Sequence, residues 1–259
     1  MARIAVVCSV LLIVVAGGVW AEQIGGPSGP QQGELRLGAE ANFRDDVEGL
    51  AVVSTMGLPL YGQRMRLSTH TFYGAIQYGL TDRLSVRGKA GMGKVGIDAI
   101  RTGAFVPGDL YDFGYGLAWS AGLQYRICAP AKPGTSFAIS GQFAHMEPDD
   151  VSVGLGGPVG WDLTDGELDE ITAALTVGTT MGKTRPYAGI VWSDLDFDFA
   201  DTMYLADQIM YQSRRSFEKD DEIGAVFGFD QDFCDRGWLN LEARVWDEAS
   251  FAATVGLSW

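Results

Sequence analysis

Past residue 21, the chain has no apolar run long enough for a membrane-spanning helix, because charged residues interrupt every stretch before about 18 residues. If the mature chain lies in a membrane, it must cross as a closed barrel, because open sheets leave backbone groups unpaired in lipid. Proline is sparse, with 9 residues, whereas glycine is abundant, with 35. This composition is typical of many strands joined by turns and does not indicate disorder.

Positive charge is also scarce. The chain has 19 Lys and Arg against 33 Asp and Glu, a formal net charge of −14. Nucleic-acid binding requires basic patches, so we predict no nucleic-acid partner. The same excess of negative charge argues against docking on an anionic bilayer surface.

The two ends of the sequence indicate an exported protein. Residues 1–21 carry Arg3, an apolar run and small or branched residues before a cleavage point after Ala21, which predicts a cleaved signal peptide. The apolar run is short for a retained anchor. Residues 22–33 are rich in Gly, Pro and Gln and predict a flexible leader. A disulfide between the two remaining cysteines, Cys128 and Cys234, is permitted in the oxidising periplasm.

The last ten residues, 250–259, alternate strictly between two faces. Phe251, Val255, Leu257 and Trp259 share the apolar face, and small or polar residues occupy the other. Alternation with period two predicts a strand. A final strand of this kind, ending on Trp, resembles the C-terminal strand of bacterial outer-membrane β-barrels, which include small porin-like and OmpA-like proteins. The resemblance implies that these four side chains are the insertion signal read by the barrel-assembly machinery. It also implies a place in the outer membrane, among lipid and lipopolysaccharide.

Nine further alternating runs precede this strand from residue 34 onward. The connections after even-numbered runs are short, and most of those after odd-numbered runs are long, as in outer-membrane barrels with short periplasmic turns. We predict an all-β fold, a ten-stranded antiparallel up-and-down transmembrane β-barrel over residues 34–259. A soluble β-sandwich also alternates. It has no reason, however, to direct apolar residues outward on every strand.

Three segments fit this scheme less simply. Residues 64–70 have the parity of the outward Phe72 but are polar at alternate positions, so either a bulge near Thr69 or projection beyond the bilayer is expected. Residues 49–60 are apolar yet fall in the predicted first external loop. Residues 201–214 have a loosely helical apolar spacing, which predicts a short external helix.

The predicted lumen face carries charges of both signs. Its charged members are Glu34, Arg36, Glu40, Arg87, Lys89, Arg126, Asp194, Asp196, Glu222, Asp230, Glu242 and Arg244. Unpaired charges in a narrow lumen are costly, so pairing across the interior would plug it. Small residues face inward on the fourth, fifth, sixth and tenth strands, which leaves room on one side. A plugged lumen and a narrow pore therefore both remain open, because strand number alone does not decide between them.

The sequence gives little support for a catalytic or metal-binding site. Outer-membrane serine hydrolases need a His beside a nucleophile, and outer-membrane aspartyl proteases carry an Asp-x-His element. The only histidines are His70 and His145, and no Asp-x-His occurs. The Asp194, Asp196 and Asp198 row offers oxygen ligands for Ca²⁺ but lacks a defined loop spacing, which favours a solvated rim. No phosphate loop, zinc-type cysteine pair or haem motif is present. We predict no catalytic residue, no metal site and no cofactor.

The function that follows is a structural outer-membrane barrel or a narrow passive pore for ions and small solutes. One alternative is an adhesion or recognition barrel whose external loops bind an unidentified extracellular ligand, since loops carry the distinguishing function of such proteins. A third is an outer-membrane hydrolase. The sequence favours a protein that is not an enzyme.

Overall fold

The computed structural model describes residue 23 and residues 25–55, 58–99, 111–127, 134–154, 159–206, 208–220, 222–246 and 248–259. Within these ranges, no helix is long and apolar enough to cross a membrane. The predicted signal peptide and Cys128 lie outside the described residues, so the cleavage and the disulfide remain predictions. Cys234 is half-buried in a turn, where its Sγ accepts a hydrogen bond from the Gly237 N–H at 3.1 Å.

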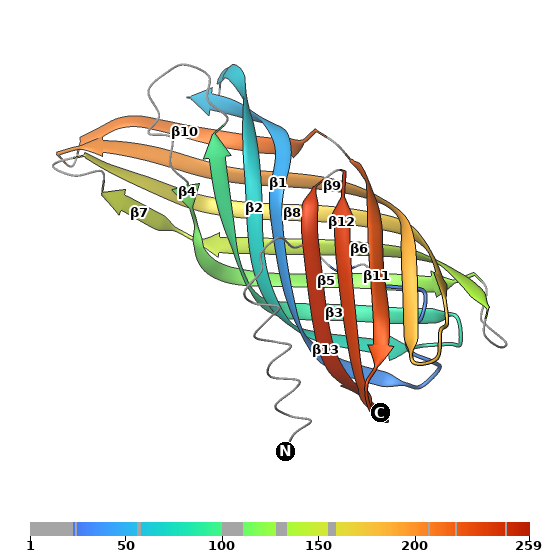
Figure 1. The fold of residues 1–259 in the computed structure, drawn as a ribbon. Helices are drawn as coiled ribbons and strands as arrows, with labels where there is room; N and C mark the ends of the chain where they lie inside the picture. The colour runs from blue at the N-terminus through green and yellow to red at the C-terminus, as the bar shows by residue number, and fades with distance from the viewer. Residues whose placement is uncertain are drawn as a thin grey trace.

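The described residues form one 13-stranded antiparallel sheet (Figure 1). Its strands are β1 (Leu35–Thr55), β2 (Leu58–Gly79), β3 (Leu84–Ala99), β4 (Tyr111–Asp112), β5 (Gly114–Arg126), β6 (Thr135–Asp149), β7 (Val151–Gly154), β8 (Val159–Thr179), β9 (Thr184–Leu205), β10 (Gln208–Lys219), β11 (Ile223–Asp232), β12 (Gly237–Val245) and β13 (Ala249–Ser258).

Hydrogen bonds close the sheet on itself. The pairings run β9–β11–β12–β13–β1–β2–β3–β5–β6–β8 and return to β9. The first and last strands join at Leu35 and Trp259, whose backbone groups exchange hydrogen bonds of 3.0 and 2.8 Å. Nearly all neighbours in this ring are neighbours in sequence. The prediction of an all-β antiparallel barrel is therefore confirmed.

The two ends of the barrel differ. Tight connections at residues 80–83, 180–183 and 233–236 define what we call the turn end. β1 begins and β13 ends at this end of the barrel. The opposite, loop end carries the β1–β2, β3–β5, β6–β8 and β9–β10 connections. The β12–β13 hairpin stops short of that end, and β9 and β10 extend well past it (Figure 1).

Beyond the β12–β13 hairpin the ring is narrower. Here β10 pairs with β9 on one side and with β1, over Gly49 to Ser54, on the other. It thus takes the place of β11, β12 and β13, so the ring has two fewer strands at this level. β1 adjusts by a register shift between Arg44 and Val47. A bulge of this kind bends a strand and increases its twist, which lets β1 leave β13 and meet β10.

Outward-facing side chains are apolar from the turn end to the middle of the barrel. Exposed members are Leu37, Phe72, Ile76, Met92, Leu117, Leu123, Ile139, Ile171, Leu175, Ile190 and Phe227. An apolar belt of this extent is stable against lipid and not against water. Closer to the loop end, the outward positions become Asp45, His70, Lys94, His145, Asp169 and Asp194. The wall therefore continues past the apolar belt into a polar environment.

The three irregular segments are resolved by this extension. β2 keeps one parity from Arg64 to Tyr78, so residues 64–70 project beyond the belt, and the bulge lies in the partner strand β1. β1 continues to Thr55 and β2 starts at Leu58, so residues 49–60 are mostly wall and not loop. The helix predicted at 201–214 is wrong, because this segment is the tip of the β9–β10 hairpin.

Candidate functional site

The lumen is the place where a pore or binding function would reside, and three layers fill it. At the turn end, the N-terminal segment, residues 25–30, lies inside the barrel, with Gly25, Gly26, Pro27 and Pro30 buried. Wall side chains hold it through hydrogen bonds: Glu242 Oε2 accepts from Gly25 N at 2.8 Å, Gln124 Nε2 donates to Gly26 O at 2.8 Å, Arg126 donates to Gly29 O at 2.7 Å, and Asp230 accepts from the Ser28 hydroxyl. A leader described only as flexible does not account for these contacts.

The middle layer is a buried ionic network where the ring narrows. Arg44 from β1 contacts Glu170 on β8 at 2.6 Å and Glu248 at 3.3 Å. Lys219, the last residue of β10, reaches Glu248 at 3.2 Å, and Arg244 reaches the same carboxylate at 3.3 Å. All five side chains are at most 2% exposed. Low dielectric strengthens such contacts but makes any unpaired member costly.

The hairpin turn between β12 and β13 delivers Glu248 to this network. Trp246 adopts φ 87°, a left-handed conformation that L-residues rarely take, and it is 78% exposed. The tight reversal places Glu248 directly below the end of β10. Its Oε1 also accepts a hydrogen bond from the Ser250 hydroxyl at 2.8 Å. The short last connection of the sequence therefore supplies a buried carboxylate to the lumen.

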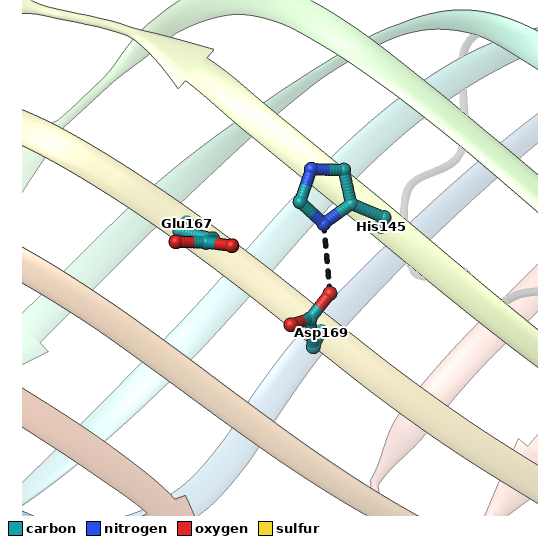
Figure 2. A group of neighbouring side chains, drawn as sticks. All are labelled: His145, Glu167 and Asp169. Atoms are coloured by element: carbon teal, nitrogen blue, oxygen red, sulfur yellow. Dashed lines mark hydrogen bonds and ion pairs between the residues drawn. The ribbon is translucent and has the colours of Figure 1, made fainter.

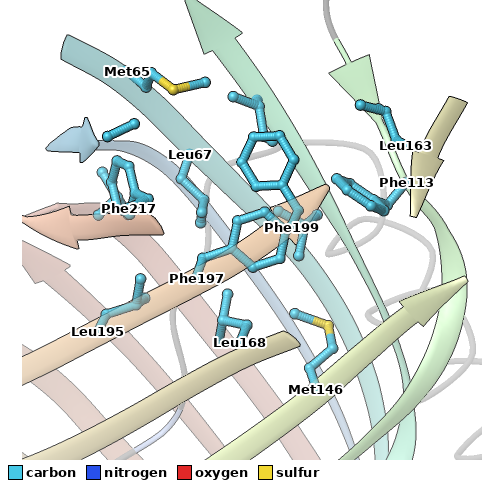
Figure 3. Close-up of a cluster of buried hydrophobic side chains, with 14 of the residues drawn as sticks. Met65, Leu67, Phe113, Met146, Leu163, Leu168, Leu195, Phe197, Phe199 and Phe217 are labelled. Carbon is cyan, nitrogen blue, oxygen red and sulfur yellow. The ribbon is translucent and has the colours of Figure 1, made fainter. Parts of the chain in front are cut away.

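The third layer is an apolar cluster that fills the barrel near the loop end (Figure 3). Its buried members are Val47, Ala51, Met65, Leu67, Tyr73, Val95, Ile97, Phe113, Ala118, Met146, Trp161, Leu163, Leu168, Leu195, Phe197, Phe199 and Phe217. The Phe113 ring packs edge-on against Phe197 and Phe199, with centroids 5.5 and 5.8 Å away. Above the apolar belt the barrel is thus built as a water-soluble one, apolar inside and polar outside.

Nine of the twelve predicted lumen residues lie in the interior or at its turn-end mouth. Glu40, Lys89, Asp230, Glu242 and Arg244 are buried. Lys89 pairs with Glu40 at 2.6 Å. In a separate group at the mouth, Arg36 pairs with Glu34 at 2.8 Å, and Arg126 contacts the N-terminal segment. Arg87 donates to Gln23 O at 2.8 Å.

The other three, Asp194, Asp196 and Glu222, are on the outer surface, and their assignment to the lumen is wrong. On β9 the side chains of Leu195, Phe197 and Phe199 are buried, so the alternate positions face outward. The sequence interpretation assumed that apolar side chains always face lipid. Past the belt the outside is aqueous, so the same alternation places the apolar set inside.

Sequence reasoning missed four members of the ionic network, namely Arg44, Glu170, Lys219 and Glu248. Arg44 and Glu170 each directly adjoin an alternating run. Their position relative to the outward residues of that run was the only feature that could have placed their side chains in the interior. Lys219 and Glu248 fall in segments that read as loops. No local pattern identifies them, because the barrel brings the four residues together from three different strands and a turn.

Comparison with known proteins gives the class of fold. No family model matches the chain, and no curated protein matches it. Among solved structures, it is similar to the outer membrane protein OprG from Pseudomonas aeruginosa, with 10% identity over 91% of this chain and 99% of that one, at a TM-score of 0.51. It is equally similar to the outer membrane protease OmpT from Escherichia coli, with 10% identity over 87% and 96%, at a TM-score of 0.51. The fold is that of bacterial outer-membrane β-barrels.

This fold and the apolar belt place the protein in the outer membrane. In such a barrel the C-terminal strand faces lipid on alternate positions. Leu257 and Trp259 are 46% and 53% exposed, whereas Ala252 and Thr254 on the opposite face are fully buried. Phe251 and Val255 share the outward face of Leu257 and Trp259. Their role as an insertion signal stays a prediction.

A second cluster of titratable side chains lies on the outside of this outer-membrane barrel, just past the belt (Figure 2). His145 on β6 faces Asp169 and Glu167 on β8, and one ligand atom from each lies within 4.8 Å of the others. His145 Nδ1 is 2.7 Å from Asp169 Oδ1, and Nε2 is 3.1 Å from Glu147 Oε1. This group has the donor types of a divalent-metal site, but both imidazole nitrogens already contact carboxylates. That arrangement suits a protonated imidazolium.

The pKa values of the two histidines are expected to be shifted in opposite directions from that of a free imidazole. Burial opposes protonation of His145, but hydrogen bonds to Asp169 and Glu147 overcome it and raise its pKa above 6.5. Burial and then Lys94 lower the pKa of His70. Because a raised pKa stabilises the fold at low pH, the contribution of His145 is present below pH 6.5 and is lost as pH rises through its folded pKa. NMR titration of the two imidazole signals, assigned with H70N and H145N, measures both. Equal pKa values would contradict the described contacts.

Proposed function

We propose that the protein is a ten-stranded up-and-down transmembrane barrel with a closed lumen, serving the outer membrane as a structural protein. The turn end faces the periplasm and the loop end projects from the cell surface, in accord with the usual placement of short turns. One observation carries this proposal, namely the filling of the interior by three successive layers. Lipid, lipopolysaccharide and the barrel-assembly machinery are the partners that this role implies.

The size of the apolar layer argues against a passive pore. Burial of a large apolar side chain is worth about 1.5–3 kcal/mol. The cluster has 17 buried members, so a water path through it would expose several of them at once, at a cost comparable with the roughly 5–15 kcal/mol net stability of a domain. The ionic layer below adds the cost of separating buried charges. Passive conduction through this conformation is therefore unfavourable.

Planar-bilayer recording of the refolded mature protein is expected to show no conductance steps. A variant without residues 22–30 is also expected to be silent, because the ionic and apolar layers remain. The shift in gel migration on heating and circular dichroism serve to show that both samples are folded. Steps from the intact protein would overturn the closed-lumen proposal. Steps from the shortened variant alone would assign closure to the N-terminal segment and favour a gated channel.

The outer wall past the belt favours recognition as a second function. Asp169, Asp194, Asp196 and Glu218 face outward on three adjacent strands, β8, β9 and β10, and Asp196 lies opposite both Asp169 and Glu218. Burial and then the neighbouring Asp194 and Glu218 carboxylates raise the pKa of Asp196. In the described part of the chain these four acids form no ion pair with Lys or Arg. A cationic extracellular partner suits such a surface.

We propose no hydrolase activity. Both ring nitrogens of His145 contact carboxylates, so neither is positioned to activate a hydroxyl nucleophile. His70 packs its ring against Phe43, with centroids 4.8 Å apart. Incubation of the folded protein with phospholipid, lipopolysaccharide and peptide substrates is expected to give no turnover above that of H145N.

A further inference from the structure

A cavity of about 170 Å³ lies at the turn-end mouth, between the N-terminal segment and the barrel wall. Its lining includes Ser28 and Gly29 on the segment side and Ser136, Gly178, Thr179 and Thr180 on the wall side. These wall residues belong to β6, β8 and the turn that follows β8. A cavity needs roughly 10–15 Å³ to admit one water, so this one has room for a small polyatomic ion.

Every charged side chain that lines the cavity is an arginine. Arg36, Arg126 and Arg185 come from β1, β5 and β9, three strands that are distant in sequence. Arg36 has a carboxylate partner in Glu34, at 2.8 Å, and Arg185 has one in Asp232, at 2.7 Å. Neither carboxylate is among the lining residues. The charge that faces the cavity is therefore positive.

Arg126 is the member of this set whose guanidinium has no carboxylate in direct contact, although Asp82 and Glu34 lie near enough to act on it electrostatically. Among the described residues it makes no ion pair, and it donates to backbone carbonyls, to Gly29 O at 2.7 Å and Asp82 O at 3.3 Å. The buried Nε of Arg185 also finds no hydrogen-bond acceptor in the described part of the chain. Guanidinium donors without an anionic acceptor are costly when desolvated. An anion in the cavity would satisfy both groups.

We propose that this cavity binds a phosphate group, held by Arg126 with support from Arg36 and Arg185. A guanidinium presents its N–H donors in a fork that matches phosphate oxygens, and it binds them more specifically than a single ammonium does. Thr179 and Thr180, which also line the cavity, offer neutral hydroxyl donors. The phosphate group can come from two sources, free phosphate in the periplasm or the headgroup of an inner-leaflet lipid.

Calorimetric titration of the folded protein with inorganic phosphate, in a phosphate-free zwitterionic detergent, tests the first source. R126Q is expected to lower phosphate affinity at least tenfold, since it removes the unpaired guanidinium. R83Q is the matched control, because Arg83 lies exposed in the turn at residues 80–83 at the same end and does not line the cavity. It removes the same charge and is expected to leave phosphate binding unchanged.

A second variant keeps the proposal testable if R126Q loses phosphate binding only because it misfolds. T180E places a carboxylate at the edge of the cavity, where it can pair with the arginines. It is expected to abolish phosphate binding while keeping or raising the melting temperature. A folded T180E that still binds phosphate would overturn the proposal.

The second source is tested by phosphorus analysis of protein extracted from phosphatidylglycerol nanodiscs. One retained lipid phosphate per chain in the wild type and in R83Q, and none in R126Q, would assign the site to a lipid headgroup. Binding of inorganic phosphate that only R126Q and T180E lose would assign it to a soluble anion. If the wild type holds neither form, or R126Q binds as tightly as R83Q, the proposal is wrong.

Discussion

Replacing Glu248 with glutamine is expected to destabilise the folded barrel by about 3–5 kcal/mol, the usual cost of breaking a buried ion pair from one side. The Glu248 carboxylate is fully buried and lies 3.2–3.3 Å from charged atoms of Lys219, Arg44 and Arg244. Glutamine keeps the volume but removes the charge, so Lys219, Arg44 and Arg244 lose a carboxylate that all three contact. Urea unfolding in zwitterionic micelles, followed by tryptophan fluorescence, measures the loss.

The control for this change is Glu167→Gln, on the exposed face of β8. It removes the same charge, and a surface substitution of this kind is expected to change stability by no more than about 0.5 kcal/mol. Adding Lys219→Met to Glu248→Gln is expected to recover part of the loss, because it removes a cation that the carboxylate had balanced. A loss below about 1 kcal/mol for Glu248→Gln would show that water reaches the network and that the middle layer is not a seal.

Strand alternation predicted the barrel well because each wall position has only two environments. The run from Tyr115 to Tyr125 alternates without a break within β5, with exposed Leu117 and Leu123 and buried Ala118. Phe113, which precedes β5 and has the same parity, is instead buried in the apolar cluster. The C-terminal run likewise paired with β1 in register from Arg36 to Asp45. These segments lie within the apolar belt, where outside means lipid.

The prediction failed on β9, which runs from the apolar belt into the polar environment past it. Leu195, Phe197 and Phe199 alternate as regularly as any lipid-facing set, and a single sequence gives the alternation but not its direction. Whether the apolar side chains face outward or inward depends on whether they lie within the apolar belt. The height of the belt depends in turn on how far the neighbouring strands extend. β10 has the same difficulty, because its spacing suggested a helix until its pairing with β1 and β9 supplied the partners.

The N-terminal segment could not be placed from composition. Residues 25–30 contain three glycines and two prolines, which read as a leader. Their backbone carbonyls and amides are what the wall side chains bind, and a Gly-Pro chain offers these groups without bulky side chains. Gly26 shows the limit, since an added Cβ would lie 2.3 Å from the Tyr187 ring. The small residues of this segment indicate that it can fit into a confined space, but they do not indicate that the space is the barrel lumen.

Replacing Phe197 with alanine is expected to destabilise the protein by about 3–5 kcal/mol, the usual cost of emptying a buried aromatic site. The ring is fully buried, stacks on Phe199 at 5.2 Å and meets Phe113 edge-on at 5.5 Å. The cavity left behind would be lined by strands of a closed ring, which cannot collapse easily.

The neighbouring Asp196→Ala is the control for Phe197→Ala, on the same strand but facing outward. It is expected to be neutral or slightly stabilising, because Asp196 is crowded by other carboxylates. Urea unfolding of the two variants therefore tests directly which side chains of β9 face the interior. If Phe197 faced lipid, its truncation would leave no cavity, and the two variants would differ by far less than about 3 kcal/mol. That result would reverse the faces of β9 and reopen the loop end of the lumen to a pore.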